Sequence, residues 1–143
     1  MEVVEDYKYL GVRLDSRGSW AGKRREALAK ARRSLWRGWG LGMGGCSAGS
    51  LSAKGAAAIF ETLVRPVVEY AGELEGGAWE EAERIQLLAG RLVLGVGKEM
   101  ANEVVRGDLG WWTLRGRRDC LRLVFWGKLV RGKADGATAR VYK

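Results

Sequence analysis

Only residues 7–14 (YKYLGVRL) have the composition of a β-strand, and this feature limits the possible folds more than any other. Aromatic and branched side chains favour a strand, and the polar segment DSRG that follows is typical of a turn. A lone strand cannot satisfy its own ladder hydrogen bonds. We therefore expect that it pairs with a later segment, or that the chain is a piece of a larger protein whose sheet it borders.

The rest of the sequence has the apolar spacing and the capping residues of helices. Ser19 is a suitable N-cap for the first helix. We predict helices from about Trp20 to Trp39, from Ser50 or Ser52 to about Glu73 with a bend at Pro66, from about Trp79 to Leu94, over a short turn at 101–107, and from a Thr113 cap to about Val130. The bend is expected because proline removes a backbone donor and kinks a helix.

Two segments are predicted to lack regular structure. Residues 38–50 (GWGLGMGGCSAGS) are rich in glycine and should form a flexible loop, and residues 132–143 should fray. The predicted organisation is a strand and turn over 1–18, a helical domain over 19–131 and a tail over 132–143. The fold class is mainly α, a four- to five-helix bundle preceded by one short N-terminal strand or hairpin.

The first and last helices are predicted to bury one side each. In the first helix the apolar stripe comprises Trp20, Ala27, Leu28, Ala31, Leu35 and Trp39. Its opposite side carries Lys23, Lys30, Arg33 and Arg37. In the last helix the predicted core stripe comprises Leu114, Leu121, Val124, Phe125 and Leu129, while Arg115 and Arg122 lie beside Trp126.

The charge of the chain is strongly positive and unevenly distributed. The formal net charge is +8, with a pI near 9.9. Lys and Arg outnumber Asp and Glu in residues 1–40 and 111–143, whereas Asp and Glu predominate in residues 41–110. Two basic ends around an acidic middle suggest a polyanionic partner that the ends contact. The alternative is a basic protein with ordinary solvated helix faces.

Several classes of site are disfavoured. Histidine is absent, which removes His-based catalysis and most zinc sites. Cys46 and Cys120 are far apart and are expected to be reduced thiols. No two of the five Asp residues are adjacent, so we expect no two-metal active site, no metal and no cofactor.

Two features that the sequence lacks lead to an expectation about where in the cell the protein is located. The acidic start MEVVEDYK does not resemble a signal peptide, and the longest uncharged run, residues 38–53, is too polar to span a bilayer. We therefore expect an intracellular protein, cytoplasmic or nuclear, without a membrane partner.

What remains is binding chemistry. A row of cations interleaved with Trp36 and Trp39 suits phosphate neutralisation and stacking, and the last helix adds a second cationic cluster. The candidate nucleic-acid contacts are Lys23, Lys30, Arg33, Arg37, Arg115, Arg117, Arg118 and Arg122. Were both helices on one side of the bundle, they would form a groove for a duplex backbone, read without sequence specificity. Alternatively, the tryptophans belong to the core and the cations are merely solvated.

Four segments occur in an order and at a spacing that resemble one protein family. These are YKYLGVRLDSRGSW, LVRPVVEYAGE, EAERIQLLAGRLVLGV, and DLGWWTLRGRRD followed by LVFWGKL. Together they resemble the region C-terminal to the catalytic palm in non-LTR (LINE-type) retrotransposon reverse transcriptases, where a Tyr-Leu-Gly strand ends the palm and a helical thumb and connection follow. The matching residues are Tyr9, Leu10, Gly11, Arg65, Pro66, Glu69, Tyr70, Glu83, Ile85, Gln86, Arg91, Gly95, Leu109, Gly110, Trp111, Leu114 and Arg118.

The resemblance implies RNA-templated DNA synthesis primed at a nick, with a thumb that grips the RNA/DNA template–primer duplex. The family's catalytic Tyr/Phe-x-Asp-Asp box is absent from this sequence, and its usual Tyr-Gly pair is Tyr70-Ala71 here. We therefore predict a C-terminal reverse transcriptase fragment that binds nucleic acid but does not polymerise. The missing palm and fingers segment is a further expected partner, and the edge strand allows self-association. The alternatives are a helical protein-interaction module and a relic reading frame without function.

Overall fold

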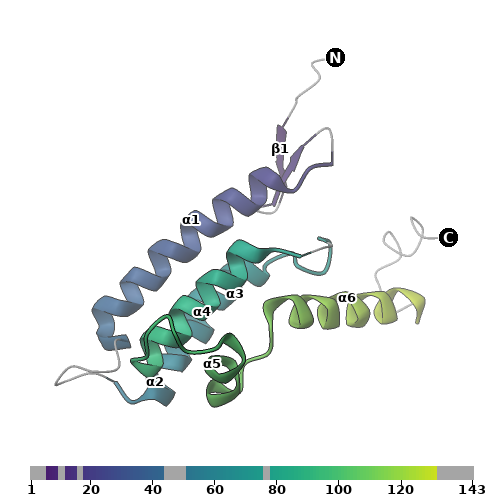
Figure 1. Cartoon of the computed structure of the whole chain (residues 1–143). Coiled ribbons are helices and arrows are strands. Elements are labelled where there is room, and N and C mark those ends of the chain that lie inside the picture. Colours follow the sequence, from purple (N-terminus) through teal and green to yellow (C-terminus); the bar gives the residue numbers. More distant parts are fainter. Residues whose placement is uncertain (1–5, 10–11, 16–17, 44–50, 76–77, 132–143) are drawn as a thin grey trace.

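The computed structural model describes residues 6–9, 12–15, 18–43, 51–75 and 78–131. These residues are mainly helical, as the sequence predicts, and the arrangement is compatible with a helical bundle (Figure 1). The predicted frayed tail at 132–143 and the part of the glycine-rich segment at 44–50 lie outside the described residues.

The N-terminal residues include two short strands, β1 (Asp6–Tyr9) and β2 (Val12–Asp15). They pair antiparallel, with Tyr7 opposite Leu14 and Tyr9 opposite Val12. The single strand predicted over 7–14 was therefore wrong, because the two halves of this segment pair with each other. The hairpin lies beside the start of α1, the first helix (Figure 1), and the Val12 side chain is buried. That these strands are the edge of a palm sheet remains a prediction.

The first helix, α1 (Ala21–Gly38), continues directly into a π-helical turn, η1 (Trp39–Met43). Residues 38–43 are therefore helical, and the prediction of a loop over this part of 38–50 was wrong. The helix begins one residue later than predicted, and its N-cap residue is Trp20, which makes no side-chain cap hydrogen bond, so the predicted Ser19 N-cap was wrong. The Ser19 hydroxyl accepts instead from the Ala21 amide, two residues on, at 3.3 Å. Ala31 and Leu35 are buried as expected, but Trp39 is 43% exposed because it lies at the border of the buried stripe, against exposed Trp36.

The second helical segment contains the only proline and shows how the backbone adapts to it. It consists of α2 (Ala53–Ile59), the π-helical turn η2 (Phe60–Val64) and α3 (Arg65–Glu69). Pro66 cannot donate a backbone hydrogen bond and its ring crowds the preceding turn. The turn widens accordingly, and the Arg65 amide bonds to the carbonyl of Phe60, five residues back. The helix then ends at Glu69, four residues earlier than predicted.

The remaining helices begin and end close to the predicted residues. They are α4 (Glu80–Leu94), α5 (Asn102–Leu109) and α6 (Leu114–Val130). The predicted Thr113 cap is confirmed, since its hydroxyl accepts from the Gly116 amide at 3.0 Å. Gly95 and Gly110 end α4 and α5 in the left-handed conformation that glycine favours.

The apolar core lies between α1, the α2–η2–α3 segment and α4, and the segment joining α5 to α6 covers one end. Phe60 stacks on Trp111, with ring centroids 4.6 Å apart. The core comprises Ala31, Leu35, Ala56, Phe60, Val64, Val68, Trp79, Ala82, Ile85, Ala89, Val93, Trp111 and Leu114. The core residues of α1, of the α2–η2–α3 segment and of α4 are spaced three or four apart, so that one face of each is buried.

The last helix departs from the predicted pattern. Leu114 and Leu129 are buried, but Leu121 and Val124 of the predicted core stripe are 39% and 56% exposed. Figure 1 shows the reason, because the C-terminal part of α6 extends away from the other described helices. Despite this apolar surface, none of the described helices combines the length and the apolar character needed to cross a membrane.

Candidate nucleic-acid interface

The outer side of α1 carries a row of cations, which we call the cationic face. It comprises Arg25, Lys30, Arg32, Arg33 and Arg37, all of them exposed. Within the part of the chain that the structure describes, the four arginines form no ion pair, whereas the Lys30 Nζ lies 2.8 Å from Glu26 Oε1. Lys30, Arg33 and Arg37 are among the predicted nucleic-acid contacts, whereas Arg25 and Arg32 were not predicted. These two are seven residues apart and so share one side of the helix, a signal that the sequence does contain.

Two tryptophans lie among these cations. Trp36 is 58% exposed and Trp39 is 43% exposed. Their rings meet edge to face, with centroids 6.4 Å apart and an interplanar angle of 69°. Trp36 and Trp39 therefore do not belong to the core, which was the alternative interpretation of these tryptophans. Exposed aromatic faces beside cations are the combination on which nucleic-acid bases stack.

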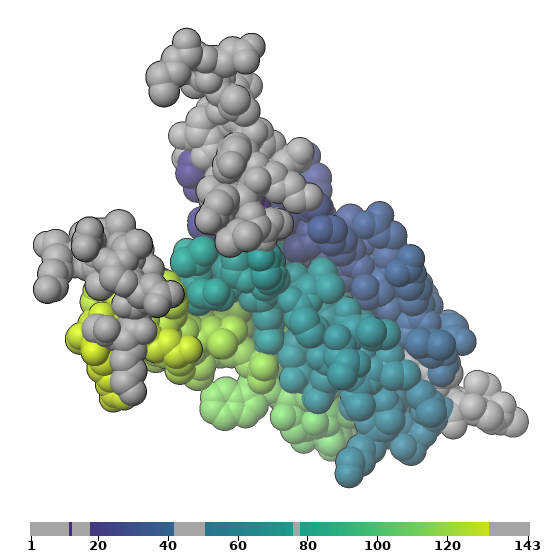
Figure 2. Space-filling model, turned by 180° about the vertical axis from the view of Figure 1, so that it is seen from behind, coloured from purple at the N-terminus to yellow at the C-terminus, as the bar shows by residue number. Residues whose placement is uncertain are grey.

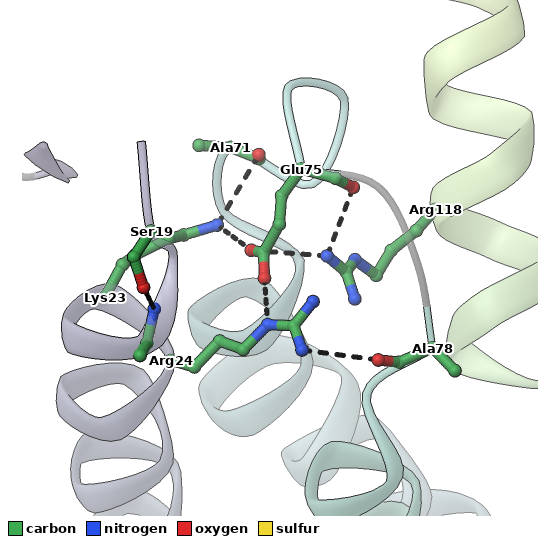
Figure 3. A network of polar contacts seen from close by, with 8 residues as sticks. Ser19, Lys23, Arg24, Ala71, Glu75, Ala78 and Arg118 are labelled. Carbon is green, nitrogen blue, oxygen red and sulfur yellow. Dashed lines mark hydrogen bonds and ion pairs between the residues drawn. The ribbon is translucent and has the colours of Figure 1, made fainter. Parts of the chain in front are cut away.

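Lys23 does not belong to the cationic face, and its predicted outward position was wrong. It is only 6% exposed and points toward Glu75, which lies after α3 (Figure 3). The Lys23 Nζ is 2.7 Å from Glu75 Oε2 and 3.5 Å from the carbonyl oxygen of Ala71. Lys23 therefore ties the first turn of α1 to the segment that follows α3.

Two arginines complete this arrangement, and we call the four residues Lys23, Arg24, Glu75 and Arg118 the Glu75 cluster. Arg24 Nε donates to Glu75 Oε1. Arg118 Nη2 lies 3.2 Å from Glu75 Oε2 and 3.3 Å from the Glu75 carbonyl oxygen. The cluster joins α1 and α6 through one carboxylate, as Figure 3 shows. Arg118 is 4% exposed, so its predicted role as a surface cation was also wrong.

The charges of the Glu75 cluster explain why its carboxylate can be buried. Burial by itself raises the pKa of Glu75, but hydrogen bonds from Lys23 and Arg24, together with the charge of Arg118, hold that pKa below its ordinary value. The Trp79 ring lies under the Arg24 and Arg118 guanidinium groups, at 5.7 and 5.4 Å. Removing these cations from Glu75 would leave a buried charge without a partner, so they are structural.

The other cations predicted on the last helix also have partners. Arg117 pairs with Glu69 of α3, and this hydrogen bond raises the pKa of Arg117. Arg115 and Arg122 are exposed and flank Asp119, at 3.9 and 3.7 Å. A carboxylate between two arginines lowers the net charge that they present. The exposed part of α6 is thus a weaker candidate for phosphate contacts than the cationic face of α1.

The two cationic helices do not form the shared groove that the sequence analysis considered. Figures 1 and 2 show α1 on one side of the molecule and α6 on the other, with α3 and α4 between them. Lys23 and Arg24 of α1 and Arg118 of α6 share the Glu75 carboxylate, which lies between the two helices. The candidate interface is therefore the outer side of α1 alone.

No metal site accompanies this interface in the described part of the chain, where no three His, Cys, Asp or Glu side chains lie close enough together to hold an ion. No family model matches the chain, and neither do any of the curated proteins or solved structures compared with it.

Proposed function

We propose that this chain binds nucleic acid through the cationic face of α1. The observation that carries the proposal is the row of exposed arginines on α1, which lie around the exposed pair Trp36 and Trp39. Lys and Arg side chains that neutralise phosphates release condensed counterions, which favours binding without reading the base sequence. The expected ligand is the backbone of an RNA/DNA duplex.

We further propose that the chain corresponds to the thumb-like region of a non-LTR retrotransposon reverse transcriptase. The order of the four sequence segments supports this, and several of the matching residues lie at contacts between helices. Glu83 pairs with Arg106 at 2.8 Å, and the Gln86 side chain donates to the Trp112 carbonyl at 2.9 Å. The chain lacks the Tyr/Phe-x-Asp-Asp box, so we propose that it does not polymerise.

The test is the affinity of the chain for a blunt RNA/DNA hybrid as a function of salt concentration. Each neutralised phosphate contributes a slope of roughly −0.9 to log K against log salt, so four contacts weaken binding about 150-fold between 50 and 200 mM salt. We expect a steep, linear decrease. Absence of binding at low salt, or an affinity that does not change with salt, would contradict the proposal.

A second candidate function is that of a helical protein-interaction module. The observation that favours it is the apolar surface of α6, where Leu123, Trp126 and Val130 are 70%, 54% and 68% exposed. These residues are spaced three and four apart and so share one side of the helix. Under this alternative, Leu123→Asp abolishes binding to a partner protein, whereas Arg33→Gln with Arg37→Gln leaves it unchanged. Partner binding that survives Leu123→Asp would contradict this alternative.

A further inference from the structure

A hollow between α1 and α3 has no role in backbone binding and differs in character from the cationic face. Its volume is about 350 Å³, at the lower end of the range of small-ligand sites. Ala27, Pro66 and Val67 give it an apolar lining, Tyr70 forms an aromatic wall, and Glu26 and Lys30 lie at its edge. Tyr70 is 52% exposed, so part of its ring is accessible to a ligand.

The charges around this hollow do not suit a free anion. Both lysines that line it already have carboxylate partners, since Lys30 pairs with Glu26 and Lys23 pairs with Glu75. A phosphate placed there would meet the Glu26 carboxylate. An uncharged, flat ligand with a polar edge fits better, because the apolar lining and the tyrosine can contact its faces. Glu26 can then accept from an amino group, and Lys30 can donate to a ring nitrogen or a carbonyl.

The position of the hollow relates it to the cationic face. Lys30, Arg33 and Arg37 are spaced three and four residues apart and therefore follow one side of α1. At 1.5 Å per residue, Arg33 and Arg37 lie roughly 5 and 10 Å beyond Lys30 along the helix axis. A strand whose phosphates contact these arginines carries its sugars and bases past the edge of the hollow.

We propose that this hollow, the base pocket, accepts one unpaired base of a bound nucleic-acid strand. The proposal rests on the proposed function, because the phosphates next to that base contact the cationic face. Bases within a duplex are paired and stacked, so they cannot enter a pocket between two helices. The ligand is therefore an unpaired nucleotide beside the duplex, such as one in a single-stranded overhang, and stacking on Tyr70 provides affinity without selecting one base.

The experiment compares three forms of one RNA/DNA hybrid by fluorescence anisotropy at fixed salt. The first is blunt, the second carries a four-nucleotide overhang, and the third carries the same overhang with abasic nucleotides. Stacking of one base strengthens binding by roughly 5- to 100-fold. We expect the overhang with bases to bind about tenfold more tightly than the abasic overhang, although both add the same phosphates.

Variants then assign this gain to the base pocket. Tyr70→Ala should remove the gain and leave the affinity for the blunt hybrid unchanged, whereas Tyr70→Phe, which keeps the ring, should retain it. Val67→Phe fills the pocket and should also remove the gain, which guards against an effect of Tyr70→Ala on folding. Equal affinity of wild type for both overhangs, or a gain that survives both Tyr70→Ala and Val67→Phe, overturns the pocket but leaves backbone binding intact. Failure of wild type to bind even the blunt hybrid overturns both proposals.

Discussion

The Glu75 cluster and the cationic face of α1 are built from the same types of side chain, and they differ in burial and in partners. Lys23 and Arg118 are 6% and 4% exposed and share one buried carboxylate. Arg33 and Arg37 are exposed and form no ion pair with another described residue. Lys23 and Arg118 can contact a phosphate only if they leave Glu75. Arg33 and Arg37 can contact a phosphate and need only release their bound counterions.

This comparison shows that a formal charge of +8 overstates the charge available to a polyanion. Several of the cations on α1 and α6 stabilise the fold, because they connect α1 and α6 to the segment after α3. Substitutions in the Glu75 cluster are therefore expected to lower stability, and substitutions on the cationic face are expected to weaken nucleic-acid binding.

The largest effect is expected from Glu75→Gln. The substitution keeps the shape of the side chain but leaves three cations without their shared carboxylate. Breaking a buried ion pair in this way costs about 3–5 kcal/mol. Urea denaturation should show a decrease of this size in the free energy of unfolding. The matched control is Glu99→Gln at an exposed position, which should change stability by less than about 0.5 kcal/mol. Equal effects of the two substitutions would show that the Glu75 cluster is not structural.

A smaller effect is expected from acid. The folded chain holds the pKa of Glu75 below its ordinary value of 4.5. As the pH falls below 4.5, the Glu75 carboxylate therefore binds a proton more readily in the unfolded chain than in the folded chain. The contribution of Glu75 to stability is thus complete above about pH 5 and is lost as the pH falls through the folded pKa. The difference in unfolding free energy between wild type and Glu75→Gln should therefore shrink below pH 4.5. A difference that stays constant from pH 6 to pH 3 would contradict this assignment.

The smallest effect concerns Ala71, whose carbonyl accepts from Lys23. It is the one non-glycine residue with a positive φ among the described residues, at 55°. This conformation costs an L-amino acid about 1–2 kcal/mol, but glycine adopts it freely. Ala71→Gly should change the free energy of unfolding by less than about 0.5 kcal/mol, because the relief of strain is offset by the entropy of glycine and by the loss of the buried methyl group. Ala29→Gly, at an exposed position in α1, should lower it by about 1 kcal/mol. A loss of stability from Ala71→Gly as large as that from Ala29→Gly would show that Ala71 is not strained.

Local signals predicted most helix boundaries. Ser52 and Thr113 cap their helices with hydroxyl groups that accept from amides three residues on, and Gly95 and Gly110 end theirs. Such contacts involve neighbours in the sequence, so the sequence contains the necessary information. The widened turn before Pro66 was only partly predicted, since the bend was expected but the π-helical form was not.

The outward or inward position of individual side chains was predicted less well. Lys23 is buried because of Glu75, which lies 52 residues away, and no local pattern indicates that pairing. Leu121 and Val124 follow a regular helical stripe, yet they are exposed because α6 leaves the other helices. A stripe predicts which residues share a face, but the neighbouring helices decide whether that face is covered.

The central claim is that the exposed arginines of α1 contact phosphates, and the salt dependence of an arginine variant tests it most directly. Arg33→Gln with Arg37→Gln should make the slope of log K against log salt for the blunt hybrid shallower by about 2. Its free energy of unfolding should stay within about 1 kcal/mol of wild type. The charge-matched control, Lys54→Gln with Arg84→Gln, removes two exposed cations elsewhere and should leave the slope unchanged. A slope for the α1 variant equal to that of wild type would contradict the account.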